Sequence, residues 1–150
     1  MRTRGWTMYW AFDWVWGLPL LVITITFHIY MFVMMEKKLI RRPRGRRVLR
    51  SLPEYIAPLA LIGLGAALLH GIEASAWAAL YVLVGALPDP GEAILYSLNA
   101  ITSYGHAEIF LAQRWRLLGA IEAMNGLILF GLTTAFLYAA IGVARAPAQS

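Results

Sequence analysis

The 150-residue sequence contains no cysteine. Disulfide bridges, thiolate metal sites and redox-active thiols are therefore excluded. Charged residues are also scarce, since Asp, Glu, Lys and Arg make up 14% of the chain, where a soluble domain has about 25%. Hydrophobic residues make up 60% instead. This balance indicates a membrane protein.

Signatures of catalysis and of repetition are missing too. No nucleophile and general base can be paired from their spacing, and no glycine-rich phosphate loop is present. We therefore expect neither an enzyme nor a bound cofactor. The sequence has no internal repeat, so a symmetric pore would have to come from the assembly of several copies.

Long apolar segments are what the sequence has in abundance. A helix needs about 20 apolar residues to cross a bilayer. Three stretches are long enough, namely residues 18–35, 53–86 and 117–143. The second is longer than a bilayer requires, so it is expected to tilt, protrude or break at an internal glycine. The expected fold class is an all-α membrane protein with no separate soluble domain.

The segment before the first span is rich in aromatic residues. Trp and Tyr favour the headgroup region of a bilayer, so we expect residues 1–16 to form an interfacial lead-in, such as a short helix lying on the surface. The sequence Gly17-Leu18-Pro19 breaks the pattern and is expected to start the first span.

A dense basic block follows the first span and determines the expected orientation. The positive-inside rule makes this block cytoplasmic, so the N-terminus is expected outside and the C-terminus in the cytoplasm, in the cell (inner) membrane. The cluster suits anionic lipid headgroups, and its confinement to one loop argues for topology rather than for a nucleic-acid partner. Its cations are Lys37, Lys38, Arg41, Arg42, Arg44, Arg46, Arg47 and Arg50.

Four polar or aromatic side chains recur on one face of the second span, at i, i+3, i+7 and i+11. Ionisable residues rarely face lipid, so we expect a seam against a neighbouring helix in which His70 and Glu73 satisfy each other. A relay for protons or ions is the alternative. The four residues are His70, Glu73, Trp77 and Tyr81.

The stretch between the second and third spans is organised differently. A turn at residues 87–92, with two prolines and a glycine, ends one helix and starts another. The next apolar run, residues 93–102, is too short to span. Because Arg114 and Arg116 precede the last span, we expect a re-entrant loop over residues 91–113. The negative end of its helix would point into the membrane and favour cations there.

Two motifs in this stretch carry a family resemblance. Ala93–Ser97 reads AILYS, similar to a pore helix of the ALYFS type, and Ile101–Glu108 reads ITSYGHAE, which aligns without a gap with a TTVGYGD filter. Arg116–Ala135 matches as well, with Gly126 at the position of a gating-hinge glycine. From the second span onward the chain therefore resembles the two-transmembrane pore domain of the potassium-channel superfamily.

This resemblance implies a passive pore for monovalent cations, built from a homotetramer with fourfold symmetry. The chain departs from the family in having Tyr104 for Val, His106 for Tyr, Ala107 for the second Gly and Glu108 for Asp. The departures leave the ion selectivity open. The implied filter residues are Thr102, Ser103, Tyr104, Gly105, His106, Ala107 and Glu108. The implied residues of the inner cavity and hinge are Glu122, Asn125, Gly126 and Thr133.

On this interpretation the chain divides into residues 1–50, with the lead-in, first span and basic loop, and residues 51–150, the two-span pore domain. Two alternatives stay open. A pore fold with this altered filter could be a non-conducting structural or accessory subunit of a larger membrane complex. His28 and His70, on different spans, could bind a haem as axial ligands.

Overall fold

The computed structural model describes residues 4–40, 52–105 and 108–145. Within these ranges the chain is all-helical, without a strand. A π-type turn follows the first helix and a 3₁₀ turn precedes the last one. The α-helices are α1 (Arg4–Met35), α2 (Leu52–Leu83), α3 (Pro90–Ile101) and α4 (Arg116–Arg145).

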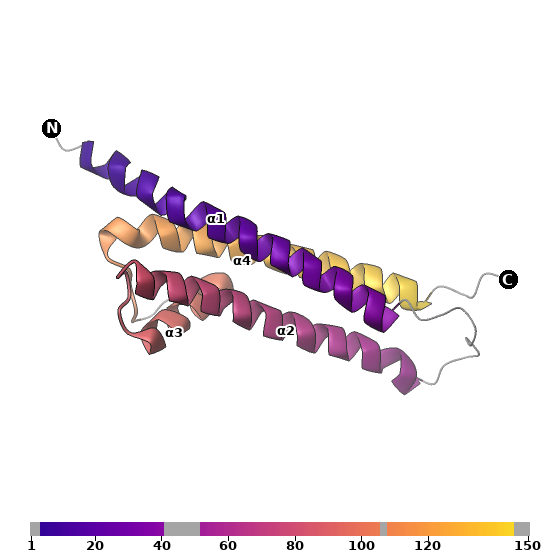
Figure 1. Ribbon diagram of the computed structural model, residues 1–150. Coiled ribbons are helices and arrows are strands. Elements are labelled where there is room, and N and C mark those ends of the chain that lie inside the picture. The colour runs from indigo at the N-terminus through magenta and orange to yellow at the C-terminus, as the bar shows by residue number, and fades with distance from the viewer. Residues whose placement is uncertain (1–3, 41–51, 106–107, 146–150) are drawn as a thin grey trace.

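The three long helices form one bundle (Figure 1). α1 and α4 lie side by side and run in the same direction, whereas α2 runs the opposite way. The short helix α3 packs beside α2, at the end of the bundle where α2 ends and α4 begins. α1 therefore begins and α4 ends at opposite ends of the molecule.

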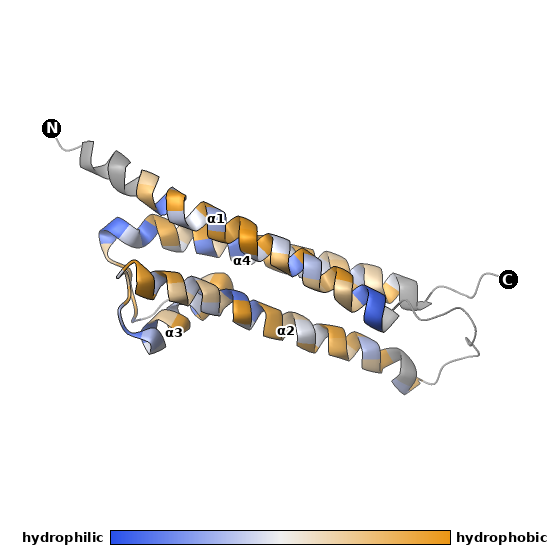
Figure 2. Cartoon of the chain, viewed as in Figure 1, coloured by the Kyte–Doolittle hydropathy of each residue, from blue (hydrophilic) through white to orange (hydrophobic). Residues whose placement is uncertain are grey.

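The long helices carry apolar side chains on their outer faces. Val22, Leu64, Leu68 and Leu127 are all exposed, and Figure 2 shows hydrophilic residues gathered mainly at the ends of the bundle. A helix whose outer surface is apolar lies against lipid rather than water. The stretches long and apolar enough to cross a membrane are Ala11–Lys38, Ile56–Leu83 and Gln113–Gly142. The expected all-α class with three spans is confirmed, and the fold fits a multi-pass membrane protein.

The start of the first helix differs from the sequence-based expectation. α1 begins at Arg4 rather than near Leu18, so the aromatic lead-in is part of the first helix and Pro19 lies inside it. A proline removes one backbone hydrogen bond, which apolar spans tolerate when neighbouring helices support the backbone. The lead-in has such support, since the Phe12 and Trp115 rings pack with centroids 5.9 Å apart.

The second span is a single unbroken helix. α2 continues through Gly63, Gly65 and Gly71, and its 32 residues reach about 48 Å at 1.5 Å per residue. It ends three residues before the expected Ala86, because Gly85 has a φ of 69° and the Ala86 N–H turns back to the Tyr81 carbonyl at 2.8 Å. This is a Schellman cap, in which a left-handed residue ends the helix.

The main core lies where α3 meets the long helices. Trp77 and Tyr81 of α2 pack there with Tyr96 of α3 and with Trp115. The Tyr81 and Tyr96 rings meet edge to face, with centroids 5.2 Å apart. This aromatic core holds α3 against α2 and α4.

Candidate functional site

The local sequence explains why a short helix starts at Pro90. The Asp89 side chain caps it by accepting a hydrogen bond from the Glu92 N–H at 2.8 Å, and Pro90 occupies the first turn, where its missing N–H costs nothing. The acidic Glu92 also lies in the first turn, at the positive end of the helix dipole. The turn and helix expected from the sequence are both confirmed.

The C-terminal end of α3 lies deep in the bundle. Ile101 is fully buried and packs with Ala74 of α2, Leu129 of α4 and Ile25 of α1. Ile25 and Leu129 are within two residues of the midpoints of their apolar stretches. The Ser97 hydroxyl contacts the Ala74 carbonyl at 2.6 Å, one turn before the end of α3. α3 therefore ends at about half the apolar length of α1 and α4.

Two glycines of α4 allow this close approach. A Cβ at Gly126 would overlap the backbone of Ile101, and a Cβ at Gly119 would overlap the hydroxyl of Tyr96. The two glycines are seven residues apart, which is two helical turns, so they lie on the same face of α4. Gly126, expected as a hinge, is thus a packing contact for the last residue of α3.

The first residues of the expected filter close the end of α3. Ser103 has a φ of 55°, and the N–H groups of Ser103 and Tyr104 bond to the carbonyls of Ala100 at 3.0 Å and Asn99 at 3.0 Å. The Thr102 hydroxyl donates to the Leu98 carbonyl at 2.6 Å. This is a second Schellman cap, with serine in the left-handed position. The carbonyls of Leu98, Asn99 and Ala100 therefore accept hydrogen bonds from within the chain. The expectation that this helix end favours cations stays a prediction.

The segment after the cap is exposed in the single chain. Tyr104 is 85% exposed, and Ser103, Gly105 and Glu108 are exposed as well. Gly105 has a φ of 93°, a conformation that residues with a Cβ rarely adopt. The two other expected filter residues, His106 and Ala107, lie outside the described residues.

Glu122 of α4 lies in a buried polar cluster with α2 and α3. Its carboxyl group accepts a hydrogen bond from the Tyr81 hydroxyl at 2.6 Å and makes a short contact with the Ser97 hydroxyl. Ser97 also contacts the Ala74 carbonyl, and one hydroxyl hydrogen cannot serve both oxygens. All three contacts are satisfied when Glu122 is protonated and donates to Ser97.

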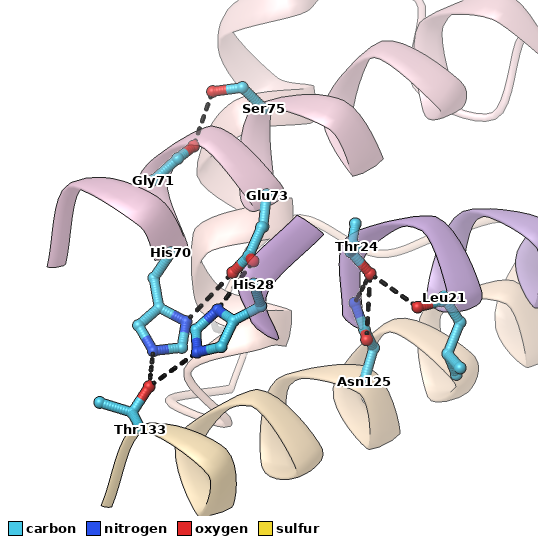
Figure 3. Close-up of polar contacts among 9 residues, drawn as sticks. All are labelled: Leu21, Thr24, His28, His70, Gly71, Glu73, Ser75, Asn125 and Thr133. Atoms are coloured by element: carbon cyan, nitrogen blue, oxygen red, sulfur yellow. Dashed lines mark hydrogen bonds and ion pairs between the residues drawn. The ribbon is translucent and has the colours of Figure 1, made fainter. Parts of the chain in front are cut away.

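Asn125 is paired with α1. Its amide donates to the Thr24 hydroxyl at 2.9 Å, and Thr24 in turn donates to the Leu21 carbonyl at 3.0 Å (Figure 3). Both side chains are buried. The pair links the middle of α1 to the middle of α4.

These contacts correct the expected inner cavity. Glu122, Asn125, Gly126 and Thr133 are all buried within one chain, where they face the other helices. A cavity on a symmetry axis between subunits would require these side chains on an outer face. The sequence identified them as polar interruptions of a span but could not show which way they face.

A third polar cluster joins three helices near the middle of the bundle (Figure 3). His28 Nδ1 lies 2.8 Å from Glu73 Oε1, and His28 Nε2 lies 3.0 Å from Thr133 Oγ1. His70 Nε2 lies 3.2 Å from the same Thr133 oxygen, and His70 Nδ1 lies 3.5 Å from Glu73 Oε2. His28 and Glu73 are at most 1% exposed. We call these four residues the histidine cluster.

The histidine cluster refines the expected seam. His70, Glu73, Trp77 and Tyr81 are all buried on the inner face of α2, as predicted. The closest partner of Glu73, however, is His28 rather than His70. Helical spacing identified the face of α2, but it could not identify a partner 45 residues earlier in the chain.

The haem alternative is wrong for this arrangement. Axial ligands lie on opposite faces of the macrocycle with the iron between them. Here both imidazoles contact the Thr133 hydroxyl and both face the Glu73 carboxylate, with ring centroids 5.2 Å apart. A porphyrin ring has no room between them.

The basic block is only partly within the described residues. Lys37 and Lys38 are exposed in the turn after α1, at the end of the bundle opposite α3. Their contact with lipid headgroups stays a prediction. The other cations of the block, Arg41, Arg42, Arg44, Arg46, Arg47 and Arg50, lie outside the described residues.

Comparisons with known proteins do not assign a family. No family model, no curated protein and no solved structure matches this chain. The resemblance to the potassium-channel superfamily therefore rests on its sequence motifs, and the function has to be inferred from the geometry.

Sequence reasoning missed the inner face of α1. Asp13, Thr24 and His28 are buried polar residues on this helix, and His28 had been considered only as a haem ligand. Their spacing was an available signal, because positions 13, 17, 21, 24, 28 and 32 follow one helical face and all are buried. A polar residue on such a stripe inside a span indicates a helix–helix contact.

Proposed function

We propose that this chain is a subunit of a passive pore for monovalent cations, and that several copies assemble around the segment that follows α3. The observation that carries the proposal is the position of the end of α3. It lies at about half the apolar length of α1 and α4, and the chain continues from it into exposed residues.

The physical argument concerns backbone groups at membrane depth. Irregular backbone within the hydrocarbon region is tolerated only where protein covers it or where it lines a water-filled path. Ser103, Tyr104 and Gly105 meet neither condition in a single chain, since all three are exposed. A closed cyclic assembly provides both cover and a central path. A homotetramer is the assembly that the family resemblance implies.

The charge near this segment favours cations. Glu108 is exposed and follows the segment by three residues. Several copies of this side chain around one axis would form an acidic ring, which attracts cations in general. We propose weak discrimination between potassium and sodium, because the filter positions differ from those of a potassium filter.

The alternative is a non-conducting subunit of a larger membrane complex. Two observations favour it. Ser103 and Tyr104 use their N–H groups to cap α3, and the polar residues of α4 bond inside the chain. Both features suit a rigid membrane scaffold as much as they suit a pore.

For the orientation we propose the N-terminus outside and the C-terminus in the cytoplasm, in the inner membrane. α1 begins at one end of the bundle and α4 finishes at the other, which supports termini on opposite sides of the membrane. The exposed Lys37 and Lys38 would then lie at the cytoplasmic surface, beside lipid headgroups.

Ion flux in proteoliposomes tests the proposal. Purified full-length protein is reconstituted, and potassium and sodium fluxes are compared for the native chain, for Tyr104→Ala and for Tyr138→Ala. The control is well matched, since Tyr138 is 81% exposed and Tyr104 85%. We expect flux in the native protein, a changed flux or potassium-to-sodium ratio for Tyr104→Ala, and native behaviour for Tyr138→Ala.

Ala107→Gly separates the two proposed functions. It restores the glycine of the potassium-channel filter. Flux that occurs only in this variant would identify a pore fold with a disabled filter. No flux in either protein would reject the pore and leave the scaffold function.

A further inference from the structure

The histidine cluster combines side chains that bind transition metals. The chain has three histidines and no cysteine, and two of those histidines lie here beside a buried carboxylate. One ligand atom from each of His28, His70 and Glu73 can be chosen so that all three lie within 4.8 Å of one another. Two imidazoles and a carboxylate are a common ligand set for zinc and for similar divalent metals.

A count of hydrogens shows that the cluster lacks a positive charge. Its four contacts each need one hydrogen, whereas two neutral imidazoles and the Thr133 hydroxyl supply three. Within the cluster, His70 Nδ1 and Glu73 Oε2 are the two buried atoms without a hydrogen-bond partner, and they lie 3.5 Å apart. Two acceptors facing each other in an apolar interior are unfavourable unless a cation lies between them.

We propose that His28, His70 and Glu73 bind a divalent transition-metal ion of the Zn²⁺ class inside the helix bundle. Zn–N and Zn–O bonds of about 2.0–2.2 Å in a tetrahedron put neighbouring ligand atoms roughly 3.4 Å apart. The 3.5 Å between His70 Nδ1 and Glu73 Oε2 matches this separation. His28 supplies the third ligand from its Nδ1 by exchanging its hydrogen bond with Glu73 for the metal, and water completes the tetrahedron.

Thr133 is the outer support of this site. With both Nδ1 atoms on the metal, both Nε2 atoms carry hydrogen, and the two lone pairs of the Thr133 oxygen can accept both N–H groups. Aromatic contacts fix the ring planes as well. His70 stacks on Phe130 at 4.5 Å, and His28 meets Phe32 edge to face at 4.3 Å. Such outer contacts orient metal-binding imidazoles.

The metal site is independent of the proposed pore. It uses none of the residues from Thr102 to Glu108, and its test measures binding rather than flux. A bound ion would join α1 to α2 through side chains that already face each other.

Cobalt binding to the full-length chain tests the site. The protein is purified in detergent with an affinity tag that lacks histidine, stripped of metal with a chelator, and titrated with Co²⁺ and then Zn²⁺. We expect one Co²⁺ per chain with the intense visible absorption of tetrahedral coordination, and displacement by Zn²⁺. A native protein that forms no visible Co²⁺ complex and binds no zinc would by itself overturn the proposal.

Variants locate the binding residues. His28→Gln, His70→Gln and Glu73→Gln should each abolish the spectrum, and Thr133→Val should weaken binding roughly 10- to 100-fold. His106→Gln is the matched control for losing a histidine, and Glu122→Gln is the control for a buried carboxyl group, since Glu122 is as buried as Glu73. Both controls should bind normally.

Two further outcomes would overturn the proposal. Binding that persists in His28→Gln and His70→Gln but is lost in His106→Gln would place the metal outside the cluster. Metal binding no stronger in the native chain than in Glu73→Gln would mean that a proton, rather than a metal, supplies the missing charge. Circular dichroism of each variant shows that the helices are intact.

Discussion

At the scale of single residues, two helices end on a residue in the left-handed conformation, one on a glycine and the other on a serine. Gly85 ends α2 at a φ of 69°, and Ser103 ends α3 at a φ of 55°. Both take the left-handed conformation, which glycine adopts freely and which costs other residues about 1–2 kcal/mol. The strained serine stands at the start of the exposed segment, which is where functional sites often keep strain.

This contrast predicts opposite effects of two substitutions. Ser103→Gly should raise the free energy of unfolding by about 1 kcal/mol, and Gly85→Ala should lower it by about the same amount. Thermal unfolding in detergent, followed by circular dichroism, measures both. Ser103→Ala keeps the Cβ and removes only the hydroxyl, so it should leave the stability nearly unchanged. A stabilisation by Ser103→Ala equal to that of Ser103→Gly would show that backbone strain is not the cause.

The protonated state inferred for Glu122 predicts a mild effect of its amide analogue. Glu122→Gln can donate to Ser97 and accept from Tyr81, so it should cost less than about 1 kcal/mol. Glu122→Leu leaves the Tyr81 hydroxyl without its acceptor, whereas Ser97 still donates to the Ala74 carbonyl, so the variant should cost roughly 1–3 kcal/mol. The same unfolding measurement applies. Equal losses for the two variants would indicate an ionised carboxylate instead.

At the scale of helices, the contact between α3 and α4 depends on glycine. Gly126→Ala would push a methyl group into the backbone of Ile101, so α3 must move or α4 must bend. We expect a loss of more than about 2 kcal/mol in stability and a loss of flux. Gly131→Ala is the matched control on the same helix.

The control should act in the opposite direction. No neighbouring atom lies within 4 Å of a Cβ at Gly131, so Gly131→Ala should stabilise α4 by up to about 1 kcal/mol through helix propensity. If Gly126 were instead a flexible hinge without a packing role, the two variants would have similar stabilities and only flux would differ.

The helices that could be predicted are those with strong local signals. α3 was predictable because Asp89, Pro90 and Glu92 mark its start. The end of the same helix was not, since a serine in the left-handed conformation has no distinctive sequence signature. The start of α1 was placed too late because Pro19 is a helix breaker in water, whereas packing overrides that preference within a bundle.

At the scale of the whole molecule, the proposed assembly would make the segment that follows α3 accessible to water. Because the chain has no cysteine, a single introduced thiol can be labelled without background. Tyr104→Cys in membranes should react with a water-soluble, membrane-impermeant maleimide. Leu68→Cys should not, since Leu68 is exposed on the outside of α2 near the midpoint of its apolar stretch.

The comparison of the two thiols tests the pore directly. Equal labelling of both would mean that the bundle is not embedded in lipid at this depth. Protection of both would mean that another protein or another copy covers Tyr104 without a water path, in agreement with the scaffold function.

The class of the molecule could be predicted from sequence, but the partners of its buried polar groups could not. Hydropathy and helix length depend on neighbouring residues, so three spans follow from local reasoning. The histidine cluster joins residues 45 and 105 positions apart. Periodicity gives the face of each helix, but the depth at which two helices meet depends on packing of the whole bundle.

The separation of these partners has a consequence for synthesis of the protein. α1 enters the membrane first, yet Thr24 and His28 find Asn125 and Thr133 only after about 100 more residues have been added. At 5–20 residues per second this takes roughly 5–20 s. During that time the polar side chains of α1 lack their partners on α4, and a translocation channel or a membrane chaperone has to shelter them. A chain truncated before α4 should therefore be degraded by the cell's membrane proteases much faster than the complete protein.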